Sequence, residues 1–205
     1  MKLMWHGHAC YTLESADGTV VFDPYEPGYV PGLSLPELAA DAILCSHYHN
    51  DHGYAAGVKQ LKRRTNLLIN DMRTFHDEDN GEKRGENLIH IVDAEGRRIV
   101  HMGDLGHTLS SEQIDALGKV DVLMIPVGGF YTIDADTAHG LAEKIGAAVT
   151  IPMHYKGEGF GFEVLSTVEA YTRLVENVEL SDSCELSLDG ELGEGRTVVL
   201  KCPVE

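Results

Sequence analysis

The sequence predicts an α/β protein in which helices cover mixed β-sheets. In the second half of the chain, short apolar runs alternate with helix-like stretches, which is typical of β–α–β units. In the first half, strand-like runs are joined by short turns, as in β-hairpins. Polar residues follow several of these runs, and ligands of α/β proteins bind where strands end.

Three strands are expected in the first third of the chain, because short β-rich runs are bounded there by turn residues. They cover residues 10–15, 19–24 and 42–47. The sequence "ADG" at 16–18 suits a turn between the first two, which would form a hairpin. The stretch 26–38, rich in proline and glycine, is expected to be one loop rather than a domain boundary.

A short helix is expected from about Tyr54 to Arg64. Its basic stretch "KQLKRR" at 59–64 fits the solvated face of that helix, and a local anion-binding patch is the alternative. Three further elements are expected next: a strand at 66–70, a polar loop at 76–87, and a hairpin over 87–104 with "EG" at its tip.

The second half of the chain predicts helices separated by buried strands. The helices are expected at 110–117, 134–146 and 166–178. Ser110 or Ser111 would cap the first helix, and Gly118 and Gly146 would end the first two. The strands are expected at 120–129 and 147–155, where the composition is typical of burial on both faces, and at 184–188 and 196–202.

Composition and charge restrict the partners and the compartment. The formal net charge of −17 disfavours polymeric nucleic acid, because an acidic surface repels phosphates. No apolar run suits a membrane span and the N-terminus lacks a secretory signal, so a cytoplasmic protein is expected. The four cysteines form no CxxC pair and are expected to be reduced. The length suggests one domain over residues 1–205.

The strongest chemical signal is "SHYHNDHG" at 46–53, directly after an apolar strand. His47 and His49 are two apart and project to the same side of an extended chain, whereas Asp51 and His52 follow after the chain has turned. One loop could therefore serve two metal ions. Imidazole and carboxylate ligands without thiolates suit zinc first, and also manganese, nickel or iron.

Two metal ions need more ligands than this loop provides. Three candidates stand at the ends of other apolar runs: His76, Asp104 after a tight exit at Gly103, and His154. Each is weak evidence alone, but their common position at strand ends makes them a set. His90 and His101 lie within expected strands and are predicted to be structural.

The segments "SHYHNDHG", "MGDLGH" and "IPMHY", in this order, resemble the metallo-β-lactamase superfamily. The opening "WHGHACYTLESADGTVVFDP" and the segment "DVLMIPVGGFYTIDADTA" are similar to one branch of it. That branch contains the ascorbate-6-phosphate lactonases and the N-acyl-phosphatidylethanolamine-hydrolysing phospholipase D. The resemblance covers roughly residues 5–160. It implies a four-layer αββα sandwich with metal ions at one edge, between two β-sheets.

The resemblance also implies roles for the candidate ligands. One metal ion would be held by His47, His49 and His76, a second by Asp51, His52 and His154, and Asp104 would bridge both. Two divalent ions about 3.5–4 Å apart lower the pKa of a shared water, and the resulting hydroxide would attack a carbonyl or phosphoryl centre. Asp51 could also orient this nucleophile or carry a proton.

Several residues outside the ligand set are weaker candidates. His8 in "WHGHAC" is expected to approach the site as a catalytic group or to support a ligand, and Asp23 to support the metal loop by hydrogen bonding. His107 in "GDLGH" could contact substrate, and Tyr131 could line the pocket. Ordinary packing is the alternative for each of them. His139 is expected on a helix surface.

The function predicted is that of a metal-dependent hydrolase acting on a small-molecule ester, lactone or amide. A small phosphodiester is the alternative substrate, and a phospholipid is disfavoured because no membrane-binding segment is evident. A redox protein on the same fold is a second class, against which histidine rather than glutamate at position 49 argues. A metal-binding protein without turnover is a third. Since no insertion forms a lid, the pocket is expected to be open or completed by a second copy of the chain.

Overall fold

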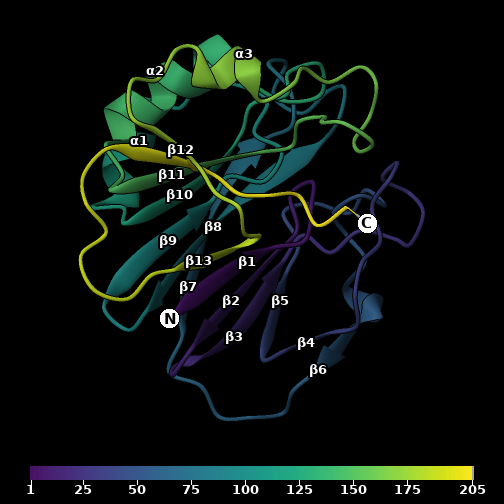
Figure 1. Ribbon diagram of the computed structural model, residues 1–205, viewed down its shortest axis with the longest axis vertical. Helices are drawn as coiled ribbons and strands as arrows, with labels where there is room; N and C mark the ends of the chain where they lie inside the picture. The colour runs from purple at the N-terminus through teal and green to yellow at the C-terminus, as the bar shows by residue number, and fades with distance from the viewer. Residues whose placement is uncertain (205) are drawn as a thin grey trace.

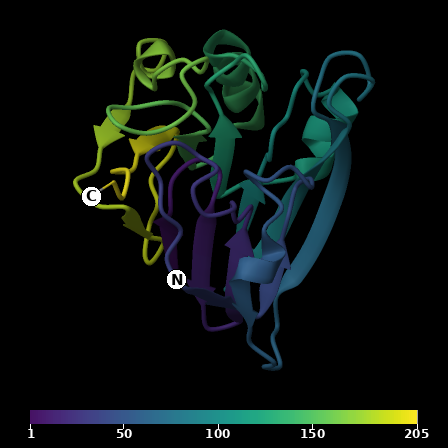
Figure 2. The ribbon, with the colours of Figure 1, turned by 90° about the vertical axis from the view of Figure 1, so that its right-hand side faces the viewer.

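The computed structural model describes residues 1–204. Over this range the strands form a five-stranded, a seven-stranded and a two-stranded sheet. The two large sheets share one apolar core, and the α-helices lie on the outer side of the seven-stranded sheet (Figure 1, Figure 2). The predicted fold class, an α/β sandwich with mixed β-sheets, is therefore confirmed.

The five-stranded sheet comes mostly from the N-terminal part of the chain. Its order is β13 (Glu185–Ser187), β1 (Lys2–Trp5), β2 (Tyr11–Ser15), β3 (Gly18–Phe22) and β5 (Ala42–Leu44). β2 and β3 form the predicted hairpin, with Ser15 opposite Gly18. Because β3 and β5 are parallel, the residues that follow them, Asp23 and Ser46, leave the sheet at the same edge.

The seven-stranded sheet brings the ends of distant strands to one edge. Its order is β12 (Val178–Leu180), β14 (Arg196–Val199), β11 (Val149–Met153), β10 (Val122–Pro126), β9 (Arg97–His101), β8 (Glu86–Ala94) and β7 (Leu68–Phe75). β9, β10 and β11 are parallel to one another. β7 runs in the same direction, because β7 and β9 each pair antiparallel with β8. His76, Asp104 and His154 therefore follow strands that all end at the same edge.

The first two helices begin and end at the predicted residues. α1 (Ser111–Leu117) has a capping box between Ser110 and Gln113, and it ends at Gly118. α2 (Ala135–Ile145) is capped by the Asp134 carboxylate and ends at Gly146 in the left-handed conformation. Within residues 1–204, no helix combines the length and the apolar character that a membrane crossing requires.

The predicted helix from Tyr54 to Arg64 is wrong. The chain instead forms one 3₁₀ turn, η1 (Ala55–Gly57), and then β6 (Val58–Gln60), which pairs parallel with β4 (Leu38–Ala40). Val58 is buried in a second core cluster that also contains Val21 of β3, so tertiary packing favours an extended conformation for this segment. The basic stretch 59–64 is therefore not a helix face.

The last predicted helix is also mostly wrong. Only α3 (Glu169–Thr172) is helical, and the chain then turns into β12. β12 pairs parallel with β14 from Val178 to Leu180, so the chain enters the sheet at the residue where the predicted helix would have ended. The strands β1, β4, β6 and β12 are additions to those that the sequence predicted.

One contact between the two sheets lies close to the edge where the strands end. The His101 ring of β9 stacks on Phe22 of β3, with ring centroids 5.2 Å apart and planes 7° from parallel. Its Nε2 hydrogen bonds to the Ala9 carbonyl, and its Nδ1 accepts from the Gly103 N–H. His101 is thus a packed structural residue, as predicted, that ties the sheets together beneath the candidate site.

Candidate metal centre

The predicted ligand residues meet at one edge of the sandwich. Their histidine and carboxylate ligand atoms form overlapping groups in which all atoms lie within 4.8 Å of one another. The groups are His47, His49 and His76; His8, Asp51, His52 and His154; and His47, His52 and Asp104. The first group is the triad that the resemblance implied for one metal ion. The second is the other implied triad with His8 added.

Asp104 lies between these groups. Its Oδ2 is 3.2 Å from His76 Nε2 and 3.3 Å from His154 Nε2, and its Oδ1 is 3.3 Å from His52 Nε2. Its carboxylate therefore contacts histidines of both groups, which is the position that a bridging ligand requires. The Asn87 side chain fixes Asp104 by accepting its backbone N–H.

Several of the candidate ligand atoms lack hydrogen-bond partners, and their spacing suits a metal ion. Among the described residues, the buried Nε2 atoms of His47, His52 and His154, together with Asp104 Oδ1, have no hydrogen-bond partner. Buried polar atoms are normally paired, so a cluster of them calls for a ligand. Two ligand atoms at 2.0–2.1 Å from a tetrahedral zinc ion lie about 3.3 Å apart, close to the separations around Asp104.

Asp23 orients His52 through a hydrogen bond to the ring nitrogen that faces away from Asp104. Its Oδ2 accepts a 2.7 Å hydrogen bond from His52 Nδ1, and its two oxygens accept from the backbone N–H and hydroxyl of Ser46. The expectation that Asp23 supports the metal loop by hydrogen bonding is confirmed. Burial opposes the charge of Asp23, but the nearby His101 and His52 outweigh it and hold the pKa of this carboxyl well below its usual range.

His8 lies closer to the ligands than the sequence could show. Its ring is buried, its Nε2 is 3.3 Å from Asp51 Oδ2, and its centroid is 4.0 Å from that of His154. The His8 carbonyl accepts hydrogen bonds from the Trp5 indole and from the backbone N–H of His154. These bonds fix the loop 6–10 against the end of β11.

Backbone strain is concentrated at the same place. His8, Asp23 and His154 all have positive φ angles, of 53°, 41° and 54°. This region is uncommon for residues other than glycine, and such strain gathers at functional sites. Each of the three residues is buried at the site, so the surrounding packing holds them in place.

The protonation states of His47 and His8 favour ligation, whereas that of His52 opposes it. Burial lowers the pKa of His47 to about 3 and that of His8 to about 4, so both rings are neutral near pH 7. Burial also acts on His52, but Asp104, Asp23 and Asp51 outweigh it and raise the pKa of this ring well above its usual value. A metal ion at His52 therefore has to displace a proton.

A pocket of about 320 Å³ opens onto these groups. It is lined by Tyr29, His49, Asp51, His76, Arg84, Asp104, Tyr131 and Phe162. Tyr131 thus lines the pocket, as the sequence analysis allowed. Tyr29, Arg84 and Phe162 are pocket residues that sequence reasoning missed, because no motif or periodicity marks them.

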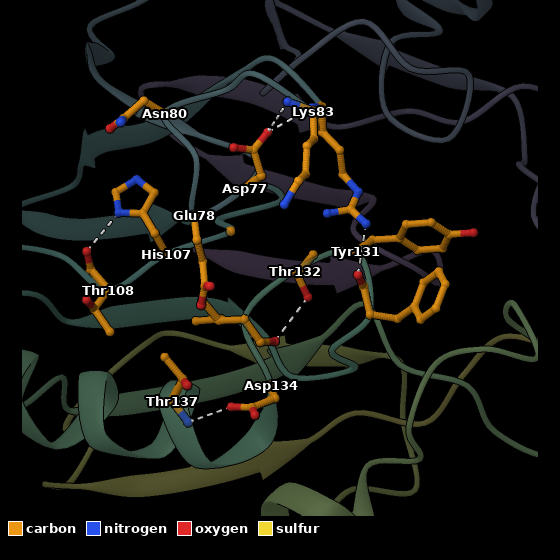
Figure 3. A pocket seen from close by; sticks show the side chains of 14 residues that line it. Asp77, Glu78, Asn80, Lys83, His107, Thr108, Tyr131, Thr132, Asp134 and Thr137 are labelled. Carbon is orange, nitrogen blue, oxygen red and sulfur yellow. Dashed lines mark hydrogen bonds between the residues drawn. The ribbon is translucent and has the colours of Figure 1, made fainter.

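The structure does not bring His107 into the ligand groups. Its Nε2 accepts the Phe75 N–H and its Nδ1 bonds the Thr108 carbonyl. The ring lines a neighbouring cavity of about 640 Å³, where His107 and Tyr131 lie at opposite sides of the view (Figure 3). His90, in β8, hydrogen bonds to Asp71 and stands apart from these groups, and His139 is partly exposed on α2.

Comparison with known proteins gives a consistent family. A family model described as a beta-lactamase superfamily domain matches residues 2–154. A UPF0173 metal-dependent hydrolase from Thermoplasma acidophilum is 30% identical over 190 residues, which cover 76% of this chain and 83% of that protein. A UPF0173 metal-dependent hydrolase from Bacillus licheniformis is 25% identical over 196 residues, covering 76% and 85%.

Solved structures give the same result. A protein from Thermotoga maritima, described as a candidate Zn-dependent hydrolase of the metallo-β-lactamase superfamily, matches with a TM-score of 0.79 and 35% identity over 97% of both chains. The metallo hydrolase Igni18 from Ignicoccus hospitalis matches with a TM-score of 0.65 over 100% of this chain and 96% of its own, and at 18% identity it supports the fold alone. The chain is a metal-dependent hydrolase that belongs to the metallo-β-lactamase superfamily.

Proposed function

We propose that this centre holds two divalent metal ions, zinc first among them, and hydrolyses a small-molecule ester, lactone or amide. The observation that carries the proposal is the pair of ligand groups with Asp104 between them. In this assignment His47, His49 and His76 hold one ion, Asp51, His52 and His154 hold the other, and Asp104 contacts both.

The bound metal pair would supply hydroxide near neutral pH and positive charge for the oxygen that becomes negative during hydrolysis. The chain itself would position the substrate and handle protons. Asp51 lines the pocket and is partly exposed, so its carboxylate can orient the attacking group or accept a proton there. His8 holds Asp51 from the buried side through its Nε2 contact of 3.3 Å.

The pocket volume supports a small substrate. About 320 Å³ lies at the lower end of the range for ligand pockets, and aromatic side chains form part of its wall. A carbonyl substrate is favoured over a phosphodiester because only one cationic side chain, Arg84, lines the described pocket. A phosphodiester on the same metal centre is the alternative, and the experiment below includes it.

The test combines metal content with turnover. Protein purified without added metal is measured by mass spectrometry and assayed with a chromogenic ester, a lactone and a phosphodiester. We expect about two metal equivalents per chain and chelator-sensitive hydrolysis, fastest with the ester or the lactone. His49→Ala and Asp104→Ala should each reduce metal content and abolish hydrolysis, whereas His139→Ala on α2 should change neither.

Unchanged metal content and activity in both ligand variants would refute the assignment. Two metal equivalents without turnover of any of the three substrates would instead favour a metal-binding protein without this activity. Faster hydrolysis of the phosphodiester would replace the substrate class and leave the metal assignment intact.

A further inference from the structure

Arg84 is fixed at the metal-centre pocket by an unusual loop. The loop follows the candidate ligand His76 and folds around the Asp77 carboxylate. That carboxylate accepts four backbone N–H groups, from Asp79, Gly81, Lys83 and Arg84, at 2.8–3.0 Å. Figure 3 shows Asp77 and Lys83 side by side in this loop. The Arg84 backbone is thus anchored directly to Asp77, and its side chain lines the same pocket as His49, Asp51 and Asp104.

The guanidinium of Arg84 has unused binding capacity. Its Nη2 donates to the Phe130 carbonyl at 3.2 Å, and its Cζ lies 5.7 Å from the centre of the Tyr131 ring. No carboxylate forms an ion pair with it among residues 1–204, whereas its neighbour Lys83 pairs with Asp79. An arginine has five N–H donors, so most of those on Arg84 remain available to a ligand.

The protein carries a formal net charge of −17, which repels anions at long range. A free cationic side chain in the pocket therefore favours anion binding there over the rest of the surface. Within the pocket, the negative charges of Asp51 and Asp104 face the proposed metal ions, whose combined charge exceeds theirs. An unpaired arginine beside that centre makes the loaded pocket attractive to a substrate with an additional negative charge. A guanidinium also matches the geometry of carboxylate and phosphate oxygens.

The remaining pocket wall is aromatic. The Phe162 ring lies edge-on to both Tyr29 and Tyr131, with centroids 6.1 Å and 6.2 Å away. These rings and Arg84 line one pocket with the candidate metal ligands. An apolar stretch of a few carbons would pack against the rings while its two ends reach the metal centre and the guanidinium.

We infer that Arg84 is a specificity-determining residue that binds a distal, non-reacting anionic group of the substrate. The substrates of this site are then small molecules in which a short apolar spacer joins the hydrolysed group to a carboxylate or a phosphate. This inference rests on the proposed function for the location of the reacting group, and it adds the chemical class of the group at the far end of the substrate.

The first test measures binding without turnover. Calorimetry on the metal-loaded protein compares butyrate, glutarate and 4-phosphonobutyrate, which share one carboxylate and differ only at the far end of the chain. Hydrogen bonds to charged groups contribute about 1.5–3 kcal/mol, so we expect at least one of the two probes with a distal anionic group to bind roughly 10–100-fold more tightly than butyrate. The tighter of the two identifies the distal group as carboxylate or phosphate.

The matched variants are Arg84→Ala and Lys83→Ala. Arg84→Ala should remove the preference for the distal anion, and Lys83→Ala, on the same loop but already paired with Asp79, should retain it. Circular dichroism and metal content check that both variants are folded and loaded. The same preference in Arg84→Ala, equal affinities of the wild-type protein for all three probes, or no binding of any of them would overturn the inference.

A kinetic arm separates this inference from the proposed function. The ratio of kcat/KM for the 4-nitrophenyl monoester of glutarate to that for 4-nitrophenyl butyrate should fall by about 10-fold or more in Arg84→Ala. An unchanged ratio would count against Arg84 while supporting the hydrolase. No turnover of either ester by the wild-type protein, with the binding preference intact, would refute ester hydrolysis and support the role of Arg84.

Discussion

Asp23 and His52 are joined by a 2.7 Å hydrogen bond between the carboxylate Oδ2 and the imidazole Nδ1, with both side chains buried. This bond keeps a proton on Nδ1, so Nε2, 3.3 Å from Asp104, is the nitrogen whose proton a metal ion would displace. Asp23 directly follows β3 and His52 lies in the loop after β5, and the parallel pairing of these strands brings their ends together. Carboxylate support of this kind raises the basicity of a histidine ligand and fixes its tautomer.

Asp23→Asn should therefore weaken metal binding. The amide cannot stabilise the His52 ring as a carboxylate does, and it also disturbs the two hydrogen bonds from Ser46. We expect the metal dissociation constant to rise about 10–100-fold, measured by competition with a chromophoric chelator. Asp41→Asn, which removes a carboxylate that accepts from Arg63 and is absent from the ligand groups, is the control and should bind metal as the wild type does. Equal affinities in all three proteins would contradict the support role.

His8→Asn tests the residue that the structure adds to the second ligand group. Asparagine tolerates the positive φ of 53° at this position, so the loop should keep its conformation. The substitution removes the Nε2 contact with Asp51, and we expect metal affinity to fall about 10-fold at one of the two proposed sites. His6→Asn, on the same loop but bonded to Thr12, should leave the affinity unchanged. If both variants bind metal equally well, His8 has no part in the centre.

Gly103→Ala should be more destabilising than its conformation alone implies. The φ of 56° costs an alanine about 1–2 kcal/mol, and a Cβ here would also overlap Asn87 Oδ1 and Ser46 Cβ. Since Asn87 holds the Asp104 backbone, the overlap should displace that ligand as well. We expect about 3 kcal/mol of destabilisation in urea, with reduced metal content.

Gly96→Ala provides the comparison for Gly103→Ala. Gly96 has a φ of 75° at the β8–β9 turn, and nothing lies within 4 Å of its added Cβ. The free energy of unfolding of Gly96→Ala should fall only by the conformational cost of about 1–2 kcal/mol, and its metal content should not change. Equal losses of unfolding free energy in the two variants would show that crowding at Gly103 is relieved by relaxation.

The clustering of the candidate ligands was predictable because its signal is local. Each of His47, His76, Asp104 and His154 follows an apolar run, and the sheet order brings the ends of those runs to one edge. The helices α1 and α2 were likewise predictable from their capping residues. In these segments the chain near each residue carries the information that determines its place.

Other features depend on contacts between distant segments. β6 forms because Val58 packs in the second core cluster and the segment pairs with β4, and neither contact is visible in the helix-like composition of residues 54–64. His8 reaches the ligands because its carbonyl is bonded by Trp5 and His154. Arg84 enters the pocket only through the Asp77 loop. No periodicity or spacing in the sequence encodes such long-range positions.

Buried histidines should also make the stability of the metal-free protein depend on pH. Burial lowers the pKa of His6 to about 4, whereas an unfolded histidine titrates near 6.5. The unfolded chain therefore binds a proton between pH 6.5 and 4 that the folded chain does not. The free energy of unfolding contributed by this residue is present above pH 6.5 and is lost progressively as pH falls toward 4.

His6→Gln measures this contribution directly. Between pH 7.5 and 5.5, each such histidine changes the free energy of unfolding by about 1 kcal/mol. The measurement is urea unfolding with chelator present. On acidification, the free energy of unfolding should fall by about this amount more in the wild-type protein than in His6→Gln. Other buried histidines and carboxylates titrate in both proteins, so their contributions cancel in the difference. An identical pH dependence in His6→Gln and wild type would mean that His6 becomes protonated without unfolding.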